Sequence, residues 1–568
     1  MMEYIKKHNQ QSLEPKAKLN EKSKQFYDNL TAWECVNADG TYDLQKYSKI
    51  YCEADCKVLR LGLQKWRELF REIDPRIDVY QFYSLPSIAE YYFRINGCYT
   101  DCYQMNGSLG AFFQNFVHGG RVMTRRNKTQ QINKLIQDFD AVSLYPSAMA
   151  LFDGFLRGVP KRITTKNYDD LKGYDGYFLK LVITKVGKPR PFPTMCHTDP
   201  KDKIKNWTNE MVGRLCFLDK YGLEDALEFQ DIEFEIIDGY YFDEGFNTTI
   251  KDKIRDIFNL RKLEKAKMKK AKKALEDATD PQEKEYWEGK MAGYDAMQLV
   301  YKELMNSTYG KLIQKTPDSE VKYRPAKDEL SFIEKYYNHV KDWYPVRGSN
   351  YLRFEIYKSL DDSYSAPHLG CQILSYSKRI MNQVMCLADD QHIKIYYQDT
   401  DSIHIEAHKV DKLNALYKSK YHKELIGEDL GEFHNDFDPE EWKGKGYKDV
   451  VSVGLIATGK KMYIGKLRGV APDGTTHYTY HKRLKGITDD AITERCLKTT
   501  KELNKDYDAW SLFEDLALKK PNQFNLGCNN RVRFEKSKGQ EYSTYSKGFT
   551  RWINREDFSY FMSCFEHK

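Results

Sequence analysis

Two aspartates stand between apolar stretches in residues 393–406, which read IKIYYQDTDSIHIE. Isoleucines alternate with polar residues on both sides of the pair, which is the pattern of two strands joined by a tight turn. Asp399 and Asp401 are therefore expected at the tip of a hairpin, where their carboxylates lie close together and repel. Two divalent cations about 4 Å apart would remove that repulsion, activate a 3′-hydroxyl and stabilise a leaving pyrophosphate. For this motif alone, a surface turn is the alternative, because Asp is common in turns.

A third acidic position lies in residues 138–147, DFDAVSLYPS. Asp140 ends an apolar, strand-like segment that starts near residue 134, so its carboxylate could face a metal ion. Pro146 then suits the start of a helix. Asp138 is a rival ligand, because residues two apart in a regular strand share a face. A structural role for Asp140 also stays open on this segment alone.

Two long helices are predicted between these acidic segments. Residues 250–275 have a helical and strongly basic pattern, and a second helix runs from Asp280-Pro281 to about residue 312. Asp280 is a good N-cap, Pro281 suits the first helical position, and Glu283 completes a start that resembles a capping box. The short loop between the helices predicts a helical hairpin.

Side chains that suit a nucleotide are predicted on both helices. Lys302, Asn306 and Tyr309 share one face of the second helix, because they stand at positions i, i+4 and i+7. Lysine pairs with a triphosphate, asparagine offers a fixed amide, and tyrosine stacks on a base or sugar. Arg261 and Lys262 of the first helix could reach the same phosphates. The alternatives are a solvated basic face on the first helix and a polar face with a core tyrosine on the second.

Further elements are predicted outside these motifs. Residues 51–71 read as an amphipathic helix, residues 86–95 suggest another, and residues 176–186 and 229–242 read as strands. The apolar face of the first of these helices consists of Val58, Leu59, Leu61, Leu63, Trp66, Leu69 and Phe70.

Composition sets the broad class. A chain of 568 residues is too long for one simple core and predicts several domains. The net charge of +7, from 90 basic and 83 acidic residues, permits a polyanionic partner without establishing one. No apolar run is long enough for a membrane span, and the polar N-terminus has no signal-peptide core. We therefore expect a soluble, intracellular protein without membrane contact.

The 12 cysteines do not form a disulfide framework. Cys52 with Cys56, and Cys98 with Cys102, are four residues apart, which is one helical turn. No CxxC pair or neighbouring histidine pair completes a zinc site, so we expect reduced thiols in a reducing compartment.

The motifs DxxSLYP, KxxxNSxYG and YxDTDS occur here in the order found in family B DNA polymerases, which the chain resembles over roughly residues 45–490. The first motif is carried by Asp140, Ser143, Leu144, Tyr145 and Pro146. The second is carried by Lys302, Asn306, Ser307, Tyr309 and Gly310. The third is carried by Tyr397, Asp399, Thr400, Asp401 and Ser402.

The resemblance implies a role for each matching position. The aspartates at 140, 399 and 401 would be the catalytic metal ligands for two Mg²⁺ ions, with Mn²⁺ as an alternative, and the spacing to Ser143 favours Asp140 over Asp138. Tyr145 would pack under the sugar and exclude a 2′-hydroxyl. The implied dNTP-binding residues are Ser143, Leu144, Tyr145, Arg261, Lys302, Asn306 and Tyr309.

Other matches point to the protein-primed subgroup of bacteriophages, linear plasmids and mobile elements. Lys461 and Tyr463 match the KxY motif that grips the primer end, and Gly119-Gly120 matches the end of a YxGG motif. The gaps before the basic helices and before Asp399 have room for the two insertions typical of that subgroup, which grip a terminal protein and enclose the DNA. Val117 replaces the tyrosine of YxGG, which leaves the template contact there in doubt but not a glycine-dependent turn. The implied primer- and template-binding residues are Gly119, Gly120, Thr400, Ser402, Lys461, Tyr463 and Lys485. For Lys485, an exposed basic turn is the alternative.

The amino-terminal region matches only part of the family's 3′–5′ exonuclease domain. Tyr51 and Asp55 match its third motif, but residues 1–50 contain no DxE. We therefore expect that the chain alone does not proofread. The gene would be split, with an upstream exonuclease-bearing polypeptide, or the chain would be a fragment, or the centre would have been lost.

The expected fold is α+β: a right-hand polymerase with an antiparallel palm, helical fingers, a small thumb and an incomplete ribonuclease H-like exonuclease domain. The expected parts are an exonuclease remnant (1–110), palm (111–150 and 367–490), first insertion (151–250), fingers (251–312), second insertion (313–366) and thumb (491–568). The thumb region, RVRFEKSKGQEYSTYSKGF, is basic with interleaved aromatics, as binding to a nucleic-acid backbone favours.

The expected function is template-directed DNA synthesis from dNTPs on a primer–template, initiated on a terminal protein, for a virus, plasmid or mobile element. A viral origin would place the chain in the host cytoplasm or nucleus. The alternatives are an inactive DNA-binding remnant, one half of a split polymerase, and a nuclease, for which the triphosphate-binding helix face would have no purpose.

Overall fold

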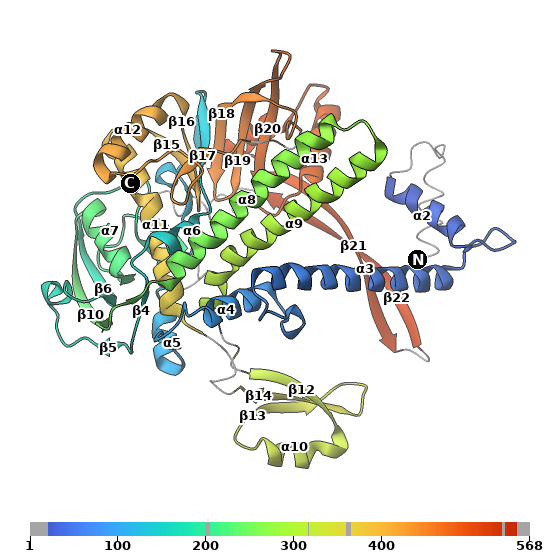
Figure 1. Cartoon of the computed structure of the whole chain (residues 1–568), viewed down its shortest axis with the longest axis horizontal. Helices are drawn as coiled ribbons and strands as arrows, with labels where there is room; N and C mark the ends of the chain where they lie inside the picture. The colour runs from blue at the N-terminus through green and yellow to red at the C-terminus, as the bar shows by residue number, and fades with distance from the viewer. Residues whose placement is uncertain are drawn as a thin grey trace. The chain divides into compact units, whose positions relative to one another are not determined.

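The computed structural model describes residues 21–198, 205–315, 317, 319–358, 365–437, 439, 441–536 and 540–553, with side chains from residue 24 to residue 524. The chain divides into two compact units, one of residues 1–83 and 527–549 and one of residues 84–526 and 550–568. Figure 1 shows the elements of both, and each unit is described by itself. In the described residues, no helix has the length and apolar character needed to cross a membrane.

The first unit contains α2 (Glu21–Ala32) and the long α3 (Leu44–Ile73). α3 begins before the predicted start at residue 51, because the Asp43 side chain caps it by accepting from the Lys46 amide at 2.9 Å. Leu69 and Phe70 are buried as expected, whereas the earlier part of the predicted apolar face is exposed. The exposed side chains of that face are Val58, Leu59, Leu61 and Leu63.

The second unit is built on a nine-stranded sheet of antiparallel pairs. Its order is β1 (Val122–Thr124), β15 (Ile395–Asp399), β16 (Ser402–Glu406), β3 (Ile136–Ala141), β18 (Lys448–Gly459), β19 (Met462–Val470) and β20 (Thr476–Leu484), with β17 (Phe433–Asn435) on β3 and β2 (Gln130–Ile132) on β18. The predicted strand–turn–strand at 393–406 is therefore confirmed as β15 and β16. This sheet is the antiparallel palm that the sequence predicts.

Helices surround the sheet. The 24-residue α11 (Pro367–Asp390) has most of its residues buried and contacts α6 (Leu144–Leu151) and α12 (Val410–Tyr421). α6 begins two residues before Pro146, which confirms the predicted helix start. The other helices are α4 (Leu85–Ile95), α5 (Gly107–Gln114), α13 (Asp489–Leu503) and α14 (Ala509–Ala517).

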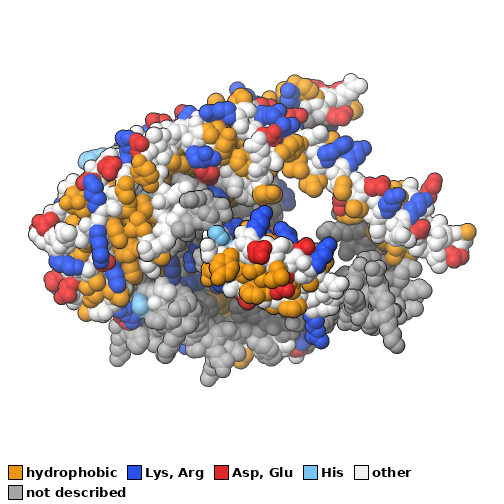
Figure 2. All heavy atoms as spheres, turned by 90° about the horizontal axis from the view of Figure 1, so that it is seen from below, with side chains coloured by type: hydrophobic (Ala, Val, Ile, Leu, Met, Phe, Trp, Pro, Cys, Tyr) orange, Lys and Arg blue, Asp and Glu red, His pale blue; other side chains and the backbone are white. Residues whose placement is uncertain are grey.

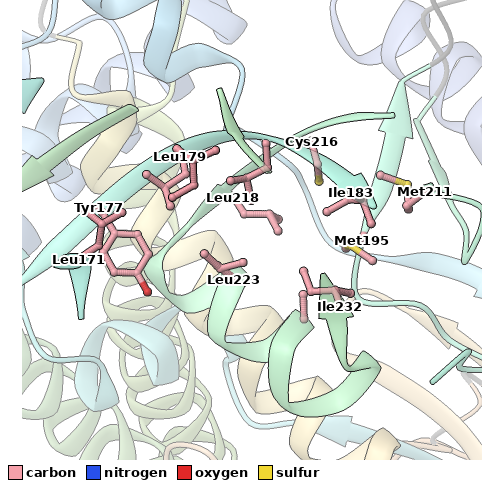
Figure 3. Close-up of a cluster of buried hydrophobic side chains, with 13 residues drawn as sticks. Leu171, Tyr177, Leu179, Ile183, Met195, Met211, Cys216, Leu218, Leu223 and Ile232 are labelled. Atoms are coloured by element: carbon pink, nitrogen blue, oxygen red, sulfur yellow. The ribbon is translucent and has the colours of Figure 1, made fainter. Parts of the chain in front are cut away.

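A second sheet lies in residues 151–250. Its order is β5 (Lys161–Arg162), β10 (Ile232–Phe242), β6 (Gly176–Val186) and β9 (Leu215–Asp219). The sheet packs against α7 (Lys220–Gln230), and Figure 3 shows Leu179, Leu218 and Leu223 among the side chains of the shared core. β6 has its predicted bounds, whereas β10 begins at Ile232 rather than at 229, because α7 extends to Gln230 and ends at Asp231 in a left-handed conformation. The remaining strands are β4 (Phe155–Leu156), β7 (Cys196–Thr198), β8 (Lys205–Trp207) and β11 (Phe246–Asn247).

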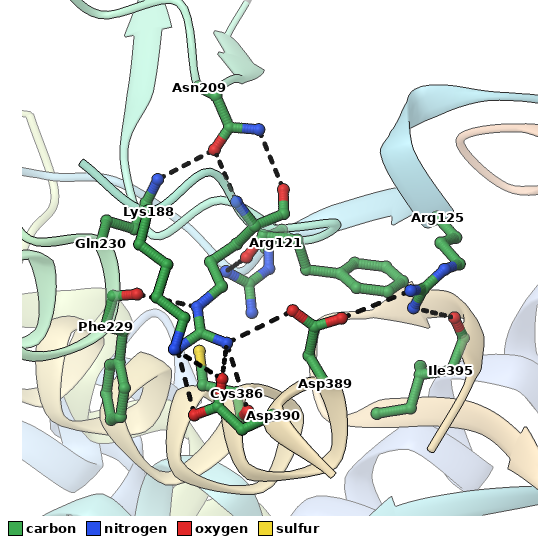
Figure 4. A network of polar contacts seen from close by, with 12 residues as sticks. Arg121, Arg125, Lys188, Asn209, Phe229, Gln230, Cys386, Asp389, Asp390 and Ile395 are labelled. Atoms are coloured by element: carbon green, nitrogen blue, oxygen red, sulfur yellow. Dashed lines mark hydrogen bonds and ion pairs between the residues drawn. The ribbon is translucent and has the colours of Figure 1, made fainter. Parts of the chain in front are cut away.

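The end of α11 is tied to the segment after β6 by a network around the buried Arg190. Its guanidinium lies 3.3 Å from Asp389 Oδ2 and 2.5 Å from Asp390 Oδ1. Figure 4 shows both carboxylates at the end of α11, where Arg125 donates to Asp389 and Lys188 donates to Asp390. These charge-assisted bonds attach the second sheet to the helix that lies behind the palm.

The predicted helical hairpin consists of α8 (Thr249–Asp277) and α9 (Pro281–Leu312), which run side by side in Figure 1. The Asp280 side chain accepts from the amides of Gln282 and Glu283, both at 3.1 Å, which confirms the predicted cap.

Residues 319–357 form a small subdomain of β12 (Ser319–Pro325), α10 (Glu329–Lys335), β13 (Val340–Pro345) and β14 (Tyr351–Tyr357), with β14 as the middle strand. Phe332 of α10 packs with Leu352, Phe354 and Ile356 on one face of this sheet. On the opposite face of β14, the side chains of Tyr351 and Tyr357 are exposed.

After β20 the chain forms α13 and α14, which share a core with β18 and β19. β21 (Asn522–Lys536) and β22 (Gln540–Ile553) then pair with each other. The basic and aromatic side chains expected to bind nucleic acid at 531–549, and the end of the predicted thumb at 554–568, lie outside the described residues.

Candidate functional site

Strand pairing brings the three aspartates of the sequence motifs to one end of the palm sheet. Ser402 of β16 pairs with Asp399 of β15 on one side and with Asp140 of β3 on the other. Asp401 lies in the turn between β15 and β16, where its carbonyl accepts from the Ala141 amide at 2.9 Å. Asp140 and Asp399, which are about 260 positions apart in the sequence, therefore lie at the same end of neighbouring strands.

The carboxylates are close enough to affect one another. Burial, and then the charges of Asp401 and Asp436, raise the pKa of Asp140 to about 8. Burial also raises the pKa of Asp401, and the charge of Asp399 acts in the same direction. A set of anionic oxygens that repel one another is the ligand chemistry that hard divalent cations prefer.

One cation of the chain already lies in this site. Lys461 Nζ is 3.2 Å from Asp399 Oδ1. In the described residues, no three His, Cys, Asp or Glu side chains converge closely enough to hold a metal ion. The three aspartates therefore have the donor chemistry for divalent cations, while the Asp399 carboxylate pairs with Lys461 instead of converging with the other two.

The rival position Asp138 lies deeper in β3. It is 6% exposed and its carboxylate is 3.6 Å from His404 Nε2, whereas Asp140 at the strand end is partly exposed. Asp140 is thus the more accessible of the two carboxylates on this face.

The first and second sequence motifs meet between α6 and the helical hairpin. The rings of Tyr145 and Tyr309 stack with centroids 4.1 Å apart and planes 25° apart. Arg261 Nη1 donates to Ser143 Oγ at 3.3 Å, and Ser143 has the left-handed φ of +47° at the start of α6. Asn306 is partly exposed on the same helix as Tyr309.

One basic side chain of the hairpin, that of Lys262, was predicted to reach the phosphates but forms an ion pair within the protein. Lys262 Nζ pairs with Asp429 Oδ1 at 2.6 Å. Lys265, which the sequence motifs do not single out, is exposed, yet the protein around its ammonium lowers its pKa. The charges of Arg261, Lys269 and Lys302 act in the same direction, and the charge of Glu428 opposes them. Lys265 therefore lies in one positive field with Arg261 and Lys302, and its i+4 spacing from Arg261 is the signal that could have found it.

The residues predicted to hold the primer end have different exposures. The Lys461 amide donates to Tyr397 Oη at 2.9 Å, and the Lys461 carbonyl accepts from the Lys485 amide at 3.0 Å. Lys461 and Lys485 are exposed, whereas Tyr463 is 6% exposed and packs 4.9 Å from the Tyr397 ring. The structure thus places Tyr463 in the core beneath the carboxylate hairpin.

The two glycines of the YxGG-like motif do not form the turn that was expected to need glycine. Neither Gly119 nor Gly120 has a positive φ. Gly120 instead packs against the carboxylate turn, where an added Cβ would lie 2.4 Å from Thr400 Cγ2. Glycine is required at residue 120 by close packing and not by backbone conformation.

Tyr51 and Asp55 lie on α3, in the other unit, and both are exposed. The Tyr51 ring stacks on Tyr47 at 6.2 Å.

Known DNA polymerases resemble this chain in their sequence profile and in their fold. The sequence profile of DNA polymerase type B, organellar and viral, matches residues 1–276. No curated protein matches the chain.

Solved structures of phi29 DNA polymerase resemble the fold. The complex with primer-template DNA and incoming nucleotide substrates is 15% identical, has a TM-score of 0.52 and covers 91% of this chain and 74% of its own. The post-translocation binary complex with primer-template DNA is 14% identical, has a TM-score of 0.51 and covers 86% and 70% respectively.

The palm sheet, the hairpin and the ordered motifs agree with the profile match and with this structural likeness. The profile match over residues 1–276 and this structural likeness together support the family of DNA polymerases of type B, organellar and viral, for this chain.

Proposed function

We propose that the chain extends a primer 3′-hydroxyl by two-metal nucleotidyl transfer at Asp140, Asp399 and Asp401. The observation that carries this is the strand pairing of Asp399 and Asp140 on either side of Ser402, with Asp401 in the adjoining turn. Two bound Mg²⁺ ions, or Mn²⁺ in their place, would lower the pKa of the 3′-hydroxyl so that it loses its proton more readily, and would stabilise the charge of the leaving pyrophosphate.

The hairpin helices bind the triphosphate in this proposal. Arg261, Lys265 and Lys302 supply the positive charge, and the shared field that lowers the pKa of Lys265 supports their convergence. Arg261 also donates to Ser143 Oγ, which joins the fingers helix to the start of α6 beside the carboxylates. The residues that hold the phosphates and those that hold the metals thus lie on adjoining elements.

The stacked pair Tyr145 and Tyr309 lies under the sugar of the incoming nucleotide in this account. Two rings in contact leave little freedom to move away, so an added 2′-hydroxyl would meet a rigid surface. Asn306, one helical turn before Tyr309, would line the nascent base pair.

Lys461 has two successive roles in the proposal. In the absence of cations its ammonium neutralises Asp399, and the entry of metal ions releases it toward the primer end. Tyr463 supports Tyr397 beneath the site.

We further propose that initiation is protein-primed and that both insertions serve it. Residues 151–250 and 319–357 each have their own sheet and core, which supports separate tasks such as holding a terminal protein and enclosing DNA.

The sheet of the second insertion has a row of aromatic side chains on one face. Strand pairing aligns Tyr323, Arg353 and Tyr344 across β12, β14 and β13, and Tyr351 and Tyr357 lie further along β14 on the same face. These tyrosines are 46–54% exposed, and the Arg353 guanidinium lies 5.1 Å from the Tyr344 ring. Aromatic rings beside an arginine suit stacking on DNA bases.

Figure 2, seen from below Figure 1, shows hydrophobic, basic and acidic side chains intermixed on the side where this subdomain lies.

The amino-terminal unit has a separate proposed task. Val58 and Leu59 of α3 lie one helical turn after the exonuclease-like Asp55, and all three side chains are exposed. We propose that a second polypeptide, which carries the remaining exonuclease carboxylates, covers this face, as in one half of a split polymerase.

Primer extension tests the central proposal against an inactive remnant and a nuclease. With dNTPs, Mg²⁺ and a primed template, the primer grows; an inactive remnant leaves it unchanged and a nuclease shortens it. Covalent transfer of labelled dNMP to the cognate terminal protein tests priming. Extension of DNA or RNA primers only, even with that protein present, would refute protein priming and leave the polymerase assignment intact.

A further inference from the structure

Arg121 is a fully buried cation with no carboxylate partner in the described residues. It is 3% exposed, and no ion pair within 4.0 Å includes it. Its Nη1 donates to the carbonyls of Phe192 and Pro193, at 3.2 and 2.6 Å, and its Nη2 donates to Asn382 Oδ1 at 3.0 Å. A buried charge held only by neutral acceptors is expensive in free energy, so it calls for a role.

The remaining donor of Arg121 reaches the strand that carries a metal-ligand aspartate. Arg121 Nε donates to Gln398 Oε1, and Gln398 is 1% exposed and precedes Asp399. The backbone of Arg121 adds a second link, because its carbonyl accepts from the Thr400 amide at 2.9 Å. Side chain and backbone of one residue thus hold both residues that flank Asp399.

Gly120 adds a steric contact to the same turn. A Cβ at residue 120 would lie 2.4, 2.8 and 2.9 Å from Thr400 Cγ2, Oγ1 and Cβ, which leaves no room for any side chain. Thr400 has a φ of +63°, a conformation that non-glycine residues adopt reluctantly and that needs support from its surroundings.

The segment before this contact is itself anchored. Lys378 Nζ of α11 donates to the His118 carbonyl at 2.9 Å, and Lys205 Nζ donates to the Val117 carbonyl at 2.6 Å. Asn382, which binds Arg121, donates in turn to Asp225 Oδ2 at 2.8 Å. The support of the turn therefore extends to α11 and to α7 of the second sheet.

We propose that Gly120 and Arg121 are positioning residues that set the conformation of the Asp399–Thr400–Asp401 turn for metal binding. The proposal rests on the proposed catalytic role of these aspartates. In this proposal Gly120, the last glycine of the YxGG-like motif, packs against the turn, and Arg121, the residue after the motif, holds the turn by hydrogen bonds. Loss of such supporting contacts behind metal ligands reduces activity by about 10–100-fold.

The test compares Gly120→Ala with the double variant Gly120→Ala/Thr400→Gly. The single variant forces a methyl group against Thr400, so kcat for primer extension falls about 10–100-fold and the Mn²⁺ concentration for half-maximal rate rises. The double variant removes the opposing side chain, and glycine tolerates the positive φ, so it regains most of the loss. The affinity for primer–template DNA, measured by fluorescence anisotropy, stays near that of the wild type in both.

Two controls separate the steric explanation from others. Gly173→Ala adds the same methyl group where no atom lies within 4 Å, and it keeps the wild-type rate. Gly119→Ala also adds its methyl group into open space, so a loss equal to that of Gly120→Ala would indicate direct contact with DNA and contradict the proposal.

Arg121→Lys provides a second route if Gly120→Ala does not fold. Lysine keeps the charge but cannot bond Gln398, Asn382 and the two carbonyls together. A reduced kcat with a raised Mn²⁺ requirement, at unchanged DNA affinity, supports the proposal; wild-type values for Arg121→Lys or Gly120→Ala, or no recovery in the double variant, overturn it. Wild-type activity in Asp399→Asn would instead overturn the proposed function itself, so the two failures are distinguishable.

Discussion

Tyr145 of α6 and Tyr309 of α9 stack with ring centroids 4.1 Å apart, which joins the palm to the fingers at a single aromatic contact. The first and second sequence motifs supply one ring each. In the proposed site, this pair forms the surface under the sugar of the incoming nucleotide.

Replacement of Tyr145 by valine is expected to weaken discrimination against ribonucleotides. The smaller side chain opens space where a 2′-hydroxyl would otherwise meet the ring, so the ratio of kcat/KM for dNTP to that for rNTP falls by about 10–200-fold. Single-nucleotide extension with each substrate measures this ratio. Tyr294→Val, the same substitution at a partly buried tyrosine of α9, is the control, and an unchanged ratio in Tyr145→Val would contradict the placement of the sugar.

Lys265→Ala is expected to raise the KM for dNTP by roughly tenfold or more, because a charge-assisted contact to the triphosphate is lost. Steady-state extension at varied dNTP concentration provides the measurement. The matched control is Lys267→Ala on the same helix, since Lys267 pairs with Glu264 at 2.6 Å. Equal effects of the two variants would indicate a general loss of positive charge and not a specific contact.

The double variant Tyr344→Ala/Tyr351→Ala is expected to shorten the products made per binding event. Each stacked base contributes about 1–3 kcal/mol, so loss of two rings weakens the grip on DNA between cycles of addition. Extension of a labelled primer in the presence of a DNA trap measures the length distribution. Tyr337→Ala serves as the control, because Tyr337 is 76% exposed but follows α10 and lies off the sheet. Unchanged product lengths in the double variant would show that this face of the sheet does not contact DNA.

The chain alone is expected to show no Mg²⁺-dependent 3′–5′ degradation of a primer without dNTPs. Asp55 is exposed on α3, and residues 1–50 contain no DxE motif that could supply further carboxylates. If a polypeptide with a DxE motif supplies the missing ligands, its addition restores degradation in the wild type but not in Asp55→Ala. Degradation by the isolated chain would contradict this account.

The sequence predicted the elements whose local signals are strong. The DTD turn follows from apolar alternation on both sides, and the α9 start follows from Asp280-Pro281, which caps the helix as expected. The family resemblance then predicted that the motifs of Asp140, Lys302 and Asp399 form one site, which no local sequence pattern indicates. For α3, the helix was predicted, but the apolar side chains from Val58 to Leu63 are exposed, because periodicity shows which side chains share a face but not whether anything covers that face.

Other parts of the site could not be predicted, because their partners are distant in the sequence. Arg121 and Gln398 are separated by 277 positions, and nothing around Arg121 distinguishes it from a surface arginine. The proposed role of Lys265 could not be predicted among its many basic neighbours, since only the packing of α8 against α9 brings its ammonium near those of Arg261 and Lys302. Likewise, the pairing of Lys461 with Asp399 depends on two strands meeting at the turn.

Asp399→Asn tests the central claim most directly, because it removes one charge at nearly constant shape. Primer extension with Mg²⁺ and dNTPs is compared with the wild type at saturating primer–template, and circular dichroism checks the fold. The account predicts that the wild type extends the primer and that the variant is slower by about 100-fold or more. Extension by Asp399→Asn at the wild-type rate would contradict the assignment of the metal site to these three aspartates.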